Sequence, residues 1–223
     1  VGIAGIISPW NFPMNVMNRK ALPALLTANT VVFKPASFTP WSGVFMAQLL
    51  EKAGLPAGVF NCVTGLGSRI GNVIVEDPRV RAISFTGSPV TGNPIIPPAG
   101  LKKFSMELGG KSPFVVFDDA DLDRAVEGAI ACKFRNCGQT CVCTNRIYVQ
   151  AGVYDEFAKK FVAATAKLKV GTGTLKDVYN GPLTDANAVE KVEEHMGDAT
   201  AKGATVLLGG KRHQLGGQFF EPT

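Results

Sequence analysis

Apolar runs rich in β-branched residues alternate with helix-like stretches over the first half of the chain. These runs predict strands at 1–7, 30–34, 58–63 and 81–85, with candidate helices between them. The strands are apolar throughout rather than alternating, which is typical of strands buried on both faces of a parallel sheet. We therefore expect a doubly wound α/β domain whose ligands bind at the carboxyl ends of its strands.

The helix between the second and third strands has the clearest boundary signals. Thr39 suits the N-cap, Pro40 the first helical position and Gly54 the position after the end. The stretch 89–100 stands where the alternation requires a helix, but it contains four prolines. We predict that a regular helix is broken there repeatedly.

The second half of the chain continues the α/β pattern after the glycine pair 109–110. The elements predicted from 102 onward are strands at 102–108 and 113–117, helices at 121–133, 152–167 and 185–202, and a strand at 204–208. We therefore place a domain boundary between 107 and 108.

Composition narrows the class of protein. Only 18% of the residues are charged, and no apolar run approaches the roughly 18 residues of a membrane span. The net charge of +5 is too small and too dispersed to indicate nucleic-acid binding. We expect a soluble protein without a membrane or nucleic-acid partner. Neither end carries a leader or a polar tail, so both look cut and the compartment stays open.

Five cysteines, an odd number, argue against a disulfide scaffold. Four of them lie within the polar segment 132–143, and the last three have a C-x3-C-x-C spacing, which lacks the paired C-x2-C spacing of zinc sites. The two histidines, His195 and His213, lie far downstream, so we predict no metal. A Cys/His hydrolase is disfavoured for the same reason but is not excluded. One buried thiol is ordinary in a core, whereas four in a polar turn indicate a reactive site.

Two segments suit a dinucleotide. Gly65, Gly67 and Gly71 follow the third strand and open a helix, which exposes backbone N–H groups to a phosphate. Their spacing is one residue longer than the dinucleotide fingerprint, so a plain glycine-rich turn is an equal alternative. The second strand ends in Lys34 and Ser37 without a carboxylate. A carboxylate would repel a 2′-phosphate, so its absence favours NADP, although Lys34 could also be a merely solvated lysine.

Five motifs, in this order and at these separations, resemble the aldehyde dehydrogenase superfamily. They are Pro9-Trp10-Asn11-Phe12-Pro13, Lys34-Pro35-Ala36-Ser37, Phe85-Thr86-Gly87-Ser88, Glu107-Leu108-Gly109-Gly110-Lys111 and Gly138-Gln139-Thr140-Cys141. Segments 133–136, 209–213 and 219–223 are most similar to the succinate-semialdehyde dehydrogenase branch. The resemblance implies an NAD(P)-dependent oxidoreductase with a cofactor-binding domain at 1–107 and a catalytic domain at 108–223. Because family members are longer, we expect both domains to be incomplete.

The resemblance also implies three catalytic residues. Cys141 matches the nucleophile, whose thiolate forms an adduct with the aldehyde and later a hydrolysable thioester. The amide of Asn11 matches the donor to the adduct's oxyanion, together with the backbone N–H of Cys141. Glu107 matches the carboxylate that activates water; from the residues alone it is only an acid at a strand end.

Arg19 and Arg135 match the arginines that hold the carboxylate of a short semialdehyde. The implied substrate is therefore succinate semialdehyde, with glutarate semialdehyde or an uncharged aldehyde as alternatives. Either arginine could instead form a surface ion pair of little energetic value. A non-catalytic dinucleotide-binding fragment is the alternative from another class of function.

The residues implied to contact NADP, or NAD as the alternative, follow the ends of strands. They are Ser8, Pro9, Trp10, Lys34, Ser37, Gly67, Gly71, Phe85, Thr86, Gly87, Ser88 and Leu108. Relatives have a regular helix after Ser88, whereas stretch 89–100 of this chain is proline-rich, so the phosphate contacts of that helix are not carried over.

Cys143 lies two residues from Cys141. In extended chain this offset gives a Cα separation of about 6.6 Å, near the upper limit for a disulfide. The resemblance implies that the pair is a reversible redox switch, the alternative being a thiol that only packs. It further implies a homo-oligomer in the full-length protein, a cytoplasmic or mitochondrial location, and a role in 4-aminobutyrate (GABA) degradation.

Overall fold

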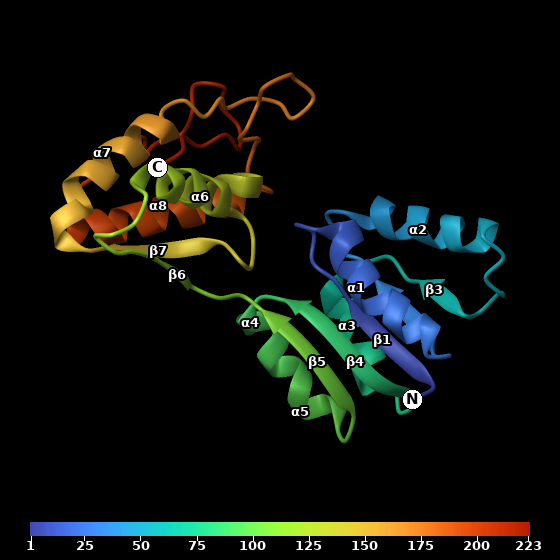
Figure 1. The fold of residues 1–223 in the computed structure, drawn as a ribbon. Helices are drawn as coiled ribbons and strands as arrows, with labels where there is room; N and C mark the ends of the chain where they lie inside the picture. Colours follow the sequence, from blue (N-terminus) through green and yellow to red (C-terminus); the bar gives the residue numbers. More distant parts are fainter. The chain divides into compact units, whose positions relative to one another are not determined.

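The computed structural model describes residues 1–223, which divide into two units, Val1–Gly109 and Gly110–Thr223, with separate cores (Figure 1). The division falls two residues after the expected boundary. The functional roles expected for the two halves stay predictions.

Five parallel strands form the sheet of the first unit, in the order β3-β2-β1-β4-β5. They are β1 (Ile3–Ile7), β2 (Thr30–Lys34), β3 (Phe60–Cys62), β4 (Val80–Gly87) and β5 (Lys103–Leu108). Helices α1 (Pro13–Leu26) and α2 (Pro40–Lys52) cover one face, and α3 (Gly67–Glu76) covers the other together with three short helical segments (Figure 1). The predicted doubly wound α/β fold is confirmed.

Adjacent residues of β1 show how the sheet is buried from both sides. Ile6 packs with Met17 of α1 and Phe33 of β2, whereas Ile7 packs with Ile74 of α3 and Ile83 of β4. A strand between two helical layers needs apolar side chains in both directions. This requirement explains why the strand sequences are continuously apolar.

The stretch 89–100 is helical in three pieces. They are α4 (Pro89–Gly92), the 3₁₀ segment η1 (Asn93–Ile95) and α5 (Ile96–Ala99), and each begins with a proline in its first two positions. Proline is tolerated there because the first N–H groups of a helix have no partner within it. The expected interruptions are present, yet Gly92, Ile95 and Ala99 are buried. The stretch therefore still covers the sheet.

The second unit pairs two parallel strands, β6 (Ser112–Val116) and β7 (Thr144–Val149). Helix α6 (Leu122–Phe134) connects them and packs on α7 (Tyr154–Thr165) around Val116, Val126 and Phe157. The 3₁₀ turns η2 (Arg135–Gly138) and η3 (Ala151–Val153) and helix α8 (Ala186–Ala201) complete the unit. Asp121 and Asp185 cap α6 and α8 by accepting backbone N–H bonds. No helix is both long and apolar enough to cross a membrane.

Two expectations about strands need correction. The strand predicted at 204–208 is wrong: these residues are irregular, and no strand lies beside them to complete their hydrogen bonds. The strand predicted at 58–63 is shorter, Phe60–Cys62. Thr39 stands at the N-cap of α2 as predicted, without a capping bond from its hydroxyl. Pro40 begins that helix as predicted, and Gly54, whose φ is 87°, takes the predicted place after its end.

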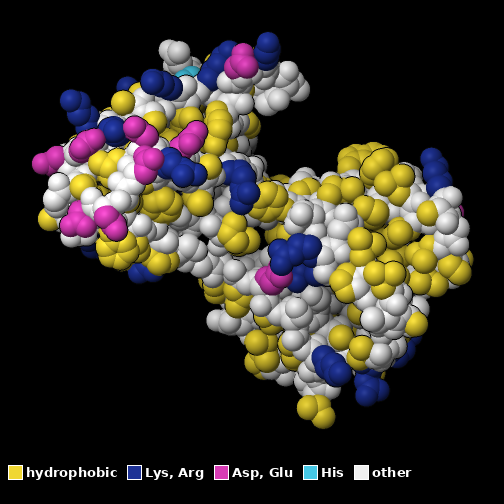
Figure 2. Space-filling view, in the orientation of Figure 1, with side chains coloured by type: hydrophobic (Ala, Val, Ile, Leu, Met, Phe, Trp, Pro, Cys, Tyr) yellow, Lys and Arg dark blue, Asp and Glu magenta, His cyan; other side chains and the backbone are white.

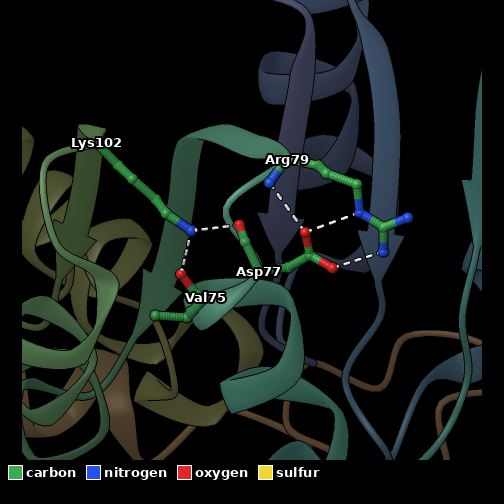
Figure 3. A network of polar contacts seen from close by, with 4 residues as sticks. All are labelled: Val75, Asp77, Arg79 and Lys102. Carbon is green, nitrogen blue, oxygen red and sulfur yellow. Dashed lines mark hydrogen bonds and ion pairs between the residues drawn. The ribbon is translucent and has the colours of Figure 1, made fainter.

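The start of β5 is tied to the end of α3 by one lysine (Figure 3). The Lys102 ammonium donates to the carbonyl oxygens of Val75 and Asp77, the latter at 2.7 Å. The Asp77 carboxylate accepts two bonds from the Arg79 guanidinium, at 2.9 and 2.6 Å, which holds the pKa of Asp77 well below its usual range. Lys102 thus satisfies carbonyls that a helix end leaves without partners.

We expect Lys102→Met to lower the thermal unfolding midpoint by about 2–4 °C, because both hydrogen bonds are lost while the aliphatic stem is kept. Circular dichroism on heating measures the change. Lys103→Met is the matched control: Lys103 is the exposed neighbour, and its replacement should leave the midpoint unchanged. An equal midpoint in both variants would show that the Lys102 contacts do not stabilise the unit.

Candidate active site

The predicted site residues of the first unit lie at or beyond the carboxyl ends of its strands. Ser8, Pro9, Trp10 and Asn11 follow β1. Lys34 is the last residue of β2, Ser37 follows it, and Gly67 comes after β3. Thr86 and Gly87 end β4 and Ser88 follows them, whereas Glu107 and Leu108 end β5. All five strands are parallel, so these ends meet at one edge of the sheet. The strand order reverses between β1 and β4, which is where ligands bind in such sheets.

Glu107 is the centre of a charged cluster at this edge. Thr86, its register partner on β4, donates its hydroxyl to Glu107 Oε2 at 3.0 Å. The Arg19 guanidinium lies 3.5 Å from Oε1, and the Lys20 ammonium 3.7 Å from Oε2. The structure therefore brings together Glu107, Arg19 and Thr86, which were all predicted site residues.

Lys20 is a site residue that sequence reasoning missed. Its side chain is buried, and its ammonium donates to the Ser84 hydroxyl at 2.9 Å. Burial lowers the pKa of Lys20, and the Glu107 carboxylate partly opposes that effect. The signal was present in the helical pattern: Lys20 falls on the buried stripe of α1 with Val16 and Met17. A lysine on such a stripe indicates a buried charged partner.

The second predicted cluster lies where β2 and β3 end. Lys34 is buried, which lowers its pKa, and its ammonium donates to the Pro35 carbonyl at 2.8 Å. Ser37 donates its hydroxyl to the Gly65 carbonyl at 3.1 Å. A Cβ placed on Gly67 would lie 4.0 Å from Lys34 Nζ, so the first turn of α3 faces that cation. Gly71 lies one turn further along α3.

A groove of about 460 Å³ opens beside this cluster. It is lined by Ser37, Pro40, Trp41, Val44, Thr64, Gly65 and Leu66. Its lining is mostly apolar. Phe45 and Leu49 of α2 are also exposed, and hydrophobic side chains gather on this unit (Figure 2). A flat aromatic or heterocyclic ring suits such a lining.

The end of β4 is shaped by close packing. Phe85 is buried beneath the edge, and a Cβ on Gly92 would come within 2.6 Å of Leu108 and 3.1 Å of the Phe85 ring. Ser88 caps α4 by accepting the Thr91 N–H at 3.2 Å. The predicted contacts Phe85 and Leu108 therefore pack against the proline-rich segment.

The predicted nucleophile belongs to the second unit, as do Arg135 and Cys143. Cys141 is exposed, just before β7, and Arg135 is exposed at the start of η2. Between them, Asn136, Cys137 and Gly138 all have positive φ, at 52°, 56° and 74°. The sequence did not indicate this left-handed run, because cysteine rarely adopts such φ values, although glycine and asparagine tolerate them.

Cys143 differs from Cys141 in its surroundings. It is buried, and its sulfur lies 3.4 Å from the carbonyl oxygens of both Lys133 and Thr144, either of which can accept its single proton. The Lys133 ammonium lies 3.7 Å from the sulfur. All five thiols are free, and no cluster of three or more possible metal ligands forms among residues 1–223.

The whole chain, residues 1–223, matches the profile of the Aldehyde dehydrogenase family, and the chain belongs to that family. It is 55% identical over 225 residues to the succinate-semialdehyde dehydrogenase of Escherichia coli (strain K12), named for NADP(+), and to a glutarate-semialdehyde dehydrogenase of Pseudomonas aeruginosa. Both alignments cover 100% of this chain and 47% of the relative. A crystal structure of succinate-semialdehyde dehydrogenase from Burkholderia pseudomallei matches with a TM-score of 0.98 at 53% identity, covering 100% of this chain and 46% of that one. The chain thus spans about half the length of these relatives.

We expect Glu107→Gln to destabilise the fold in a pH-dependent way, because the carboxylate partly offsets the burial of the Lys20 cation. A buried cation with a lowered pKa destabilises the folded state while it is protonated, and this effect fades as the pH rises through the folded-state pKa toward 10.5. The midpoint should therefore drop at neutral pH and recover toward the parental value in alkali.

Thermal unfolding of parent and variant over this pH range tests the coupling. In a Lys20→Met background, the loss caused by Glu107→Gln should no longer vary with pH. A loss of equal size at every pH in the parent background would rule out the assigned Lys20–Glu107 interaction.

Proposed function

We propose that the protein oxidises a short aldehyde with a distal carboxylate, succinate semialdehyde in particular, to the acid, with NADP as the hydride acceptor. Membership of the aldehyde dehydrogenase family supports the reaction class. The single observation that carries the chemistry is the exposed thiol of Cys141, the last residue of the Gly-Gln-Thr-Cys motif. The left-handed turn 136–138 precedes it. An exposed thiol can reach an external carbonyl carbon, whereas the buried Cys143 cannot.

In the proposed reaction the Cys141 sulfur adds to the aldehyde carbon and forms a thiohemiacetal. The Asn11 amide and the backbone N–H of Cys141 donate to the oxyanion and stabilise it as charge appears. A nicotinamide nucleotide, when bound, would accept the hydride that leaves the adduct's carbon, and the adduct would become a thioester. Water then hydrolyses the thioester, which releases the acid and restores the thiol.

Glu107 is the proposed base for the attacking water. The Glu107 side chain is about two-fifths exposed, so water reaches it, and Thr86 fixes one carboxylate oxygen by hydrogen bonding. Lys20 and Arg19 surround it with positive charge. The Lys20 ammonium donates to Ser84, so it stays 3.7 Å from Glu107 Oε2 and holds the carboxylate in position.

Two arginines are proposed to select the substrate. A guanidinium binds a carboxylate through two parallel hydrogen bonds, which fixes its distance from the reacting carbon. Arg19 is about two-thirds exposed, and its pair with Glu107 is correspondingly weak. It can therefore exchange that contact for a substrate carboxylate. Arg135 is exposed and six residues from Cys141. Glutarate semialdehyde, one carbon longer, is the alternative substrate.

The residues at the ends of β2 and β3 fit an NADP adenosine. The groove beside Trp41 accommodates a ring, and Lys34 and Ser37 present a cation and a hydroxyl without a carboxylate. Arg69 adds a second cation on the first turn of α3, which has no acidic residue. A cation at that end opposes the helix dipole, so an anion such as a 2′-phosphate would relieve the repulsion.

The decisive assay mixes the intact protein with succinate semialdehyde and NADP and follows reduced cofactor by its near-ultraviolet absorbance. Turnover is expected in the parent, none in Cys141→Ala, and a loss of about 10²- to 10³-fold in kcat in Asn11→Ala. Arg135→Ala should lower kcat/KM for succinate semialdehyde about ten- to hundredfold while leaving butanal unaffected.

Arg124→Ala, at an exposed position of α6, is the control for loss of a positive charge and should behave as the parent. No turnover by the parent with either NADP or NAD would favour a non-catalytic nucleotide-binding protein. Equal losses for both aldehydes in Arg135→Ala would remove the carboxylate selection from the proposal.

Cofactor choice is tested by Ser37→Glu. The new carboxylate should repel a 2′-phosphate, so the ratio of kcat/KM for NADP to that for NAD should fall by at least about tenfold. Gln48→Glu adds the same charge on the exposed side of α2 and should leave the ratio unchanged. An unchanged ratio in Ser37→Glu would place the 2′-phosphate elsewhere.

Cys141 and Cys143 are further proposed to form a reversible redox switch. Peroxide would oxidise the two thiols to a disulfide and be reduced to two waters, and dithiothreitol would reverse the change. The free state of both thiols and the ammonium of Lys133 beside Cys143 support this reading.

We expect peroxide to inactivate the intact protein and dithiothreitol to restore it, with restoration much reduced in Cys143→Ala. Residual activity after each treatment is the measurement, and Cys132→Ala, at an exposed thiol of α6, serves as control. Recovery as complete in Cys143→Ala as in the parent would exclude the switch.

A further inference from the structure

The turn that precedes Cys141 is unusual in its backbone. Asn136, Cys137 and Gly138 are consecutively left-handed, at φ 52°, 56° and 74°. Cysteine is rarely found in this region, whereas glycine and asparagine tolerate it. Such a run persists only where its surroundings hold it in place.

Part of the support comes from within the turn. The Gln139 N–H donates to the Asn136 carbonyl at 3.0 Å, and the Asn136 amide donates to the Gln139 carbonyl at 3.3 Å. These bonds close the turn on itself. They do not fix its direction relative to the rest of the unit.

Two side chains provide that fixation. The Cys137 thiol donates to the Gly181 carbonyl at 3.2 Å, and the Gln139 side-chain oxygen accepts the Thr184 N–H at 3.0 Å. The partners lie 44 and 45 residues away along the chain. Burial raises the pKa of the Cys137 thiol, so it keeps its proton and remains a donor at neutral pH.

The segment 180–184 is a firm support for these contacts. Asn180 is buried and its carbonyl accepts the Gly171 N–H at 3.0 Å, while buried Leu183 donates its N–H to the Gln218 carbonyl at 2.9 Å. The segment is therefore held by backbone bonds to two other parts of the second unit. A loop bound to it at two points cannot rotate freely.

We propose that Cys137 and Gln139 are positioning residues, which lock the turn 136–139 onto segment 180–184 and so aim the thiol and the backbone N–H of Cys141. The inference rests on the proposed function, in which Cys141 is the nucleophile. Cys141 lies only two residues after Gln139, so its orientation follows that of the turn. The lock gives a role to a cysteine and an amide that the proposed chemistry does not itself use.

The test measures how fast iodoacetamide alkylates Cys141 in the intact protein, without aldehyde or cofactor, with the modified thiol identified by tandem mass spectrometry. Cys137→Ala removes the donor, and Cys137→Ser keeps one. We expect the alanine variant to slow alkylation about three- to tenfold, and the serine variant to restore most of the rate. In the enzyme assay, kcat should fall likewise while KM for NADP stays unchanged.

Gln139→Met removes the other contact at similar side-chain length and should act in the same direction. It also decides the question if Cys137→Ala does not fold. Cys132→Ala, at an exposed thiol outside the turn, is the matched control and should keep the parental rate.

Parental alkylation rates in the folded Cys137→Ala and Gln139→Met variants would overturn the lock. Failure of serine to restore the rate would overturn the donor role of Cys137. If Cys141 of the parent reacts no faster than Cys132 of the same molecule, the proposed nucleophile itself is contradicted, which is distinct from both results.

Discussion

Parallel pairing of five strands is the constraint on which the first unit depends. It places every strand's carboxyl end at one edge, so that residues as distant in sequence as Asn11 and Glu107 follow neighbouring parts of one sheet. The helical layers on both faces leave only this edge and its opposite for polar groups. The charged side chains at the edge are therefore a consequence of topology, and each needs a partner there.

The two charged clusters at this edge differ in how far their charges are paired within the protein. Glu107 has two cations and a hydroxyl around it, so its charge is balanced within the protein. Lys34 donates only to a carbonyl and has no carboxylate beside it. A balanced carboxylate suits proton transfer, whereas an uncompensated buried cation suits an external anion.

The alternation of strands and helices was predictable because each apolar run in the first unit has a partner strand and two covering layers. Prediction failed where a strand depends on its neighbour rather than on its own pattern. Residues 204–208 are mostly apolar and include the β-branched Thr205 and Val206, but they stay irregular. Strand β7, with polar Asn145 and Arg146 in its sequence, pairs with β6 and was missed. Strand pairing depends on two segments, whereas a hydrophobic pattern describes only one of them.

The same distinction holds for the candidate site. Motifs identified Glu107 and Cys141, but Lys20 and the contacts of Cys137 depend on what a fold brings near them. Neither the left-handed turn at 136–138 nor its support by segment 180–184 can be read from local composition, since asparagine and cysteine do not require that backbone.

The prolines of the segment from Pro89 to Ala99 have a mechanical consequence. Four of its residues carry no amide hydrogen, so the internal ladder that stiffens an ordinary helix is largely missing. Its shape is then maintained by the fit of Gly92, Ile95 and Ala99 into the hydrophobic interior. The segment is therefore only as rigid as the side-chain packing beneath it, and warming that weakens this packing would loosen the segment before the sheet that it covers.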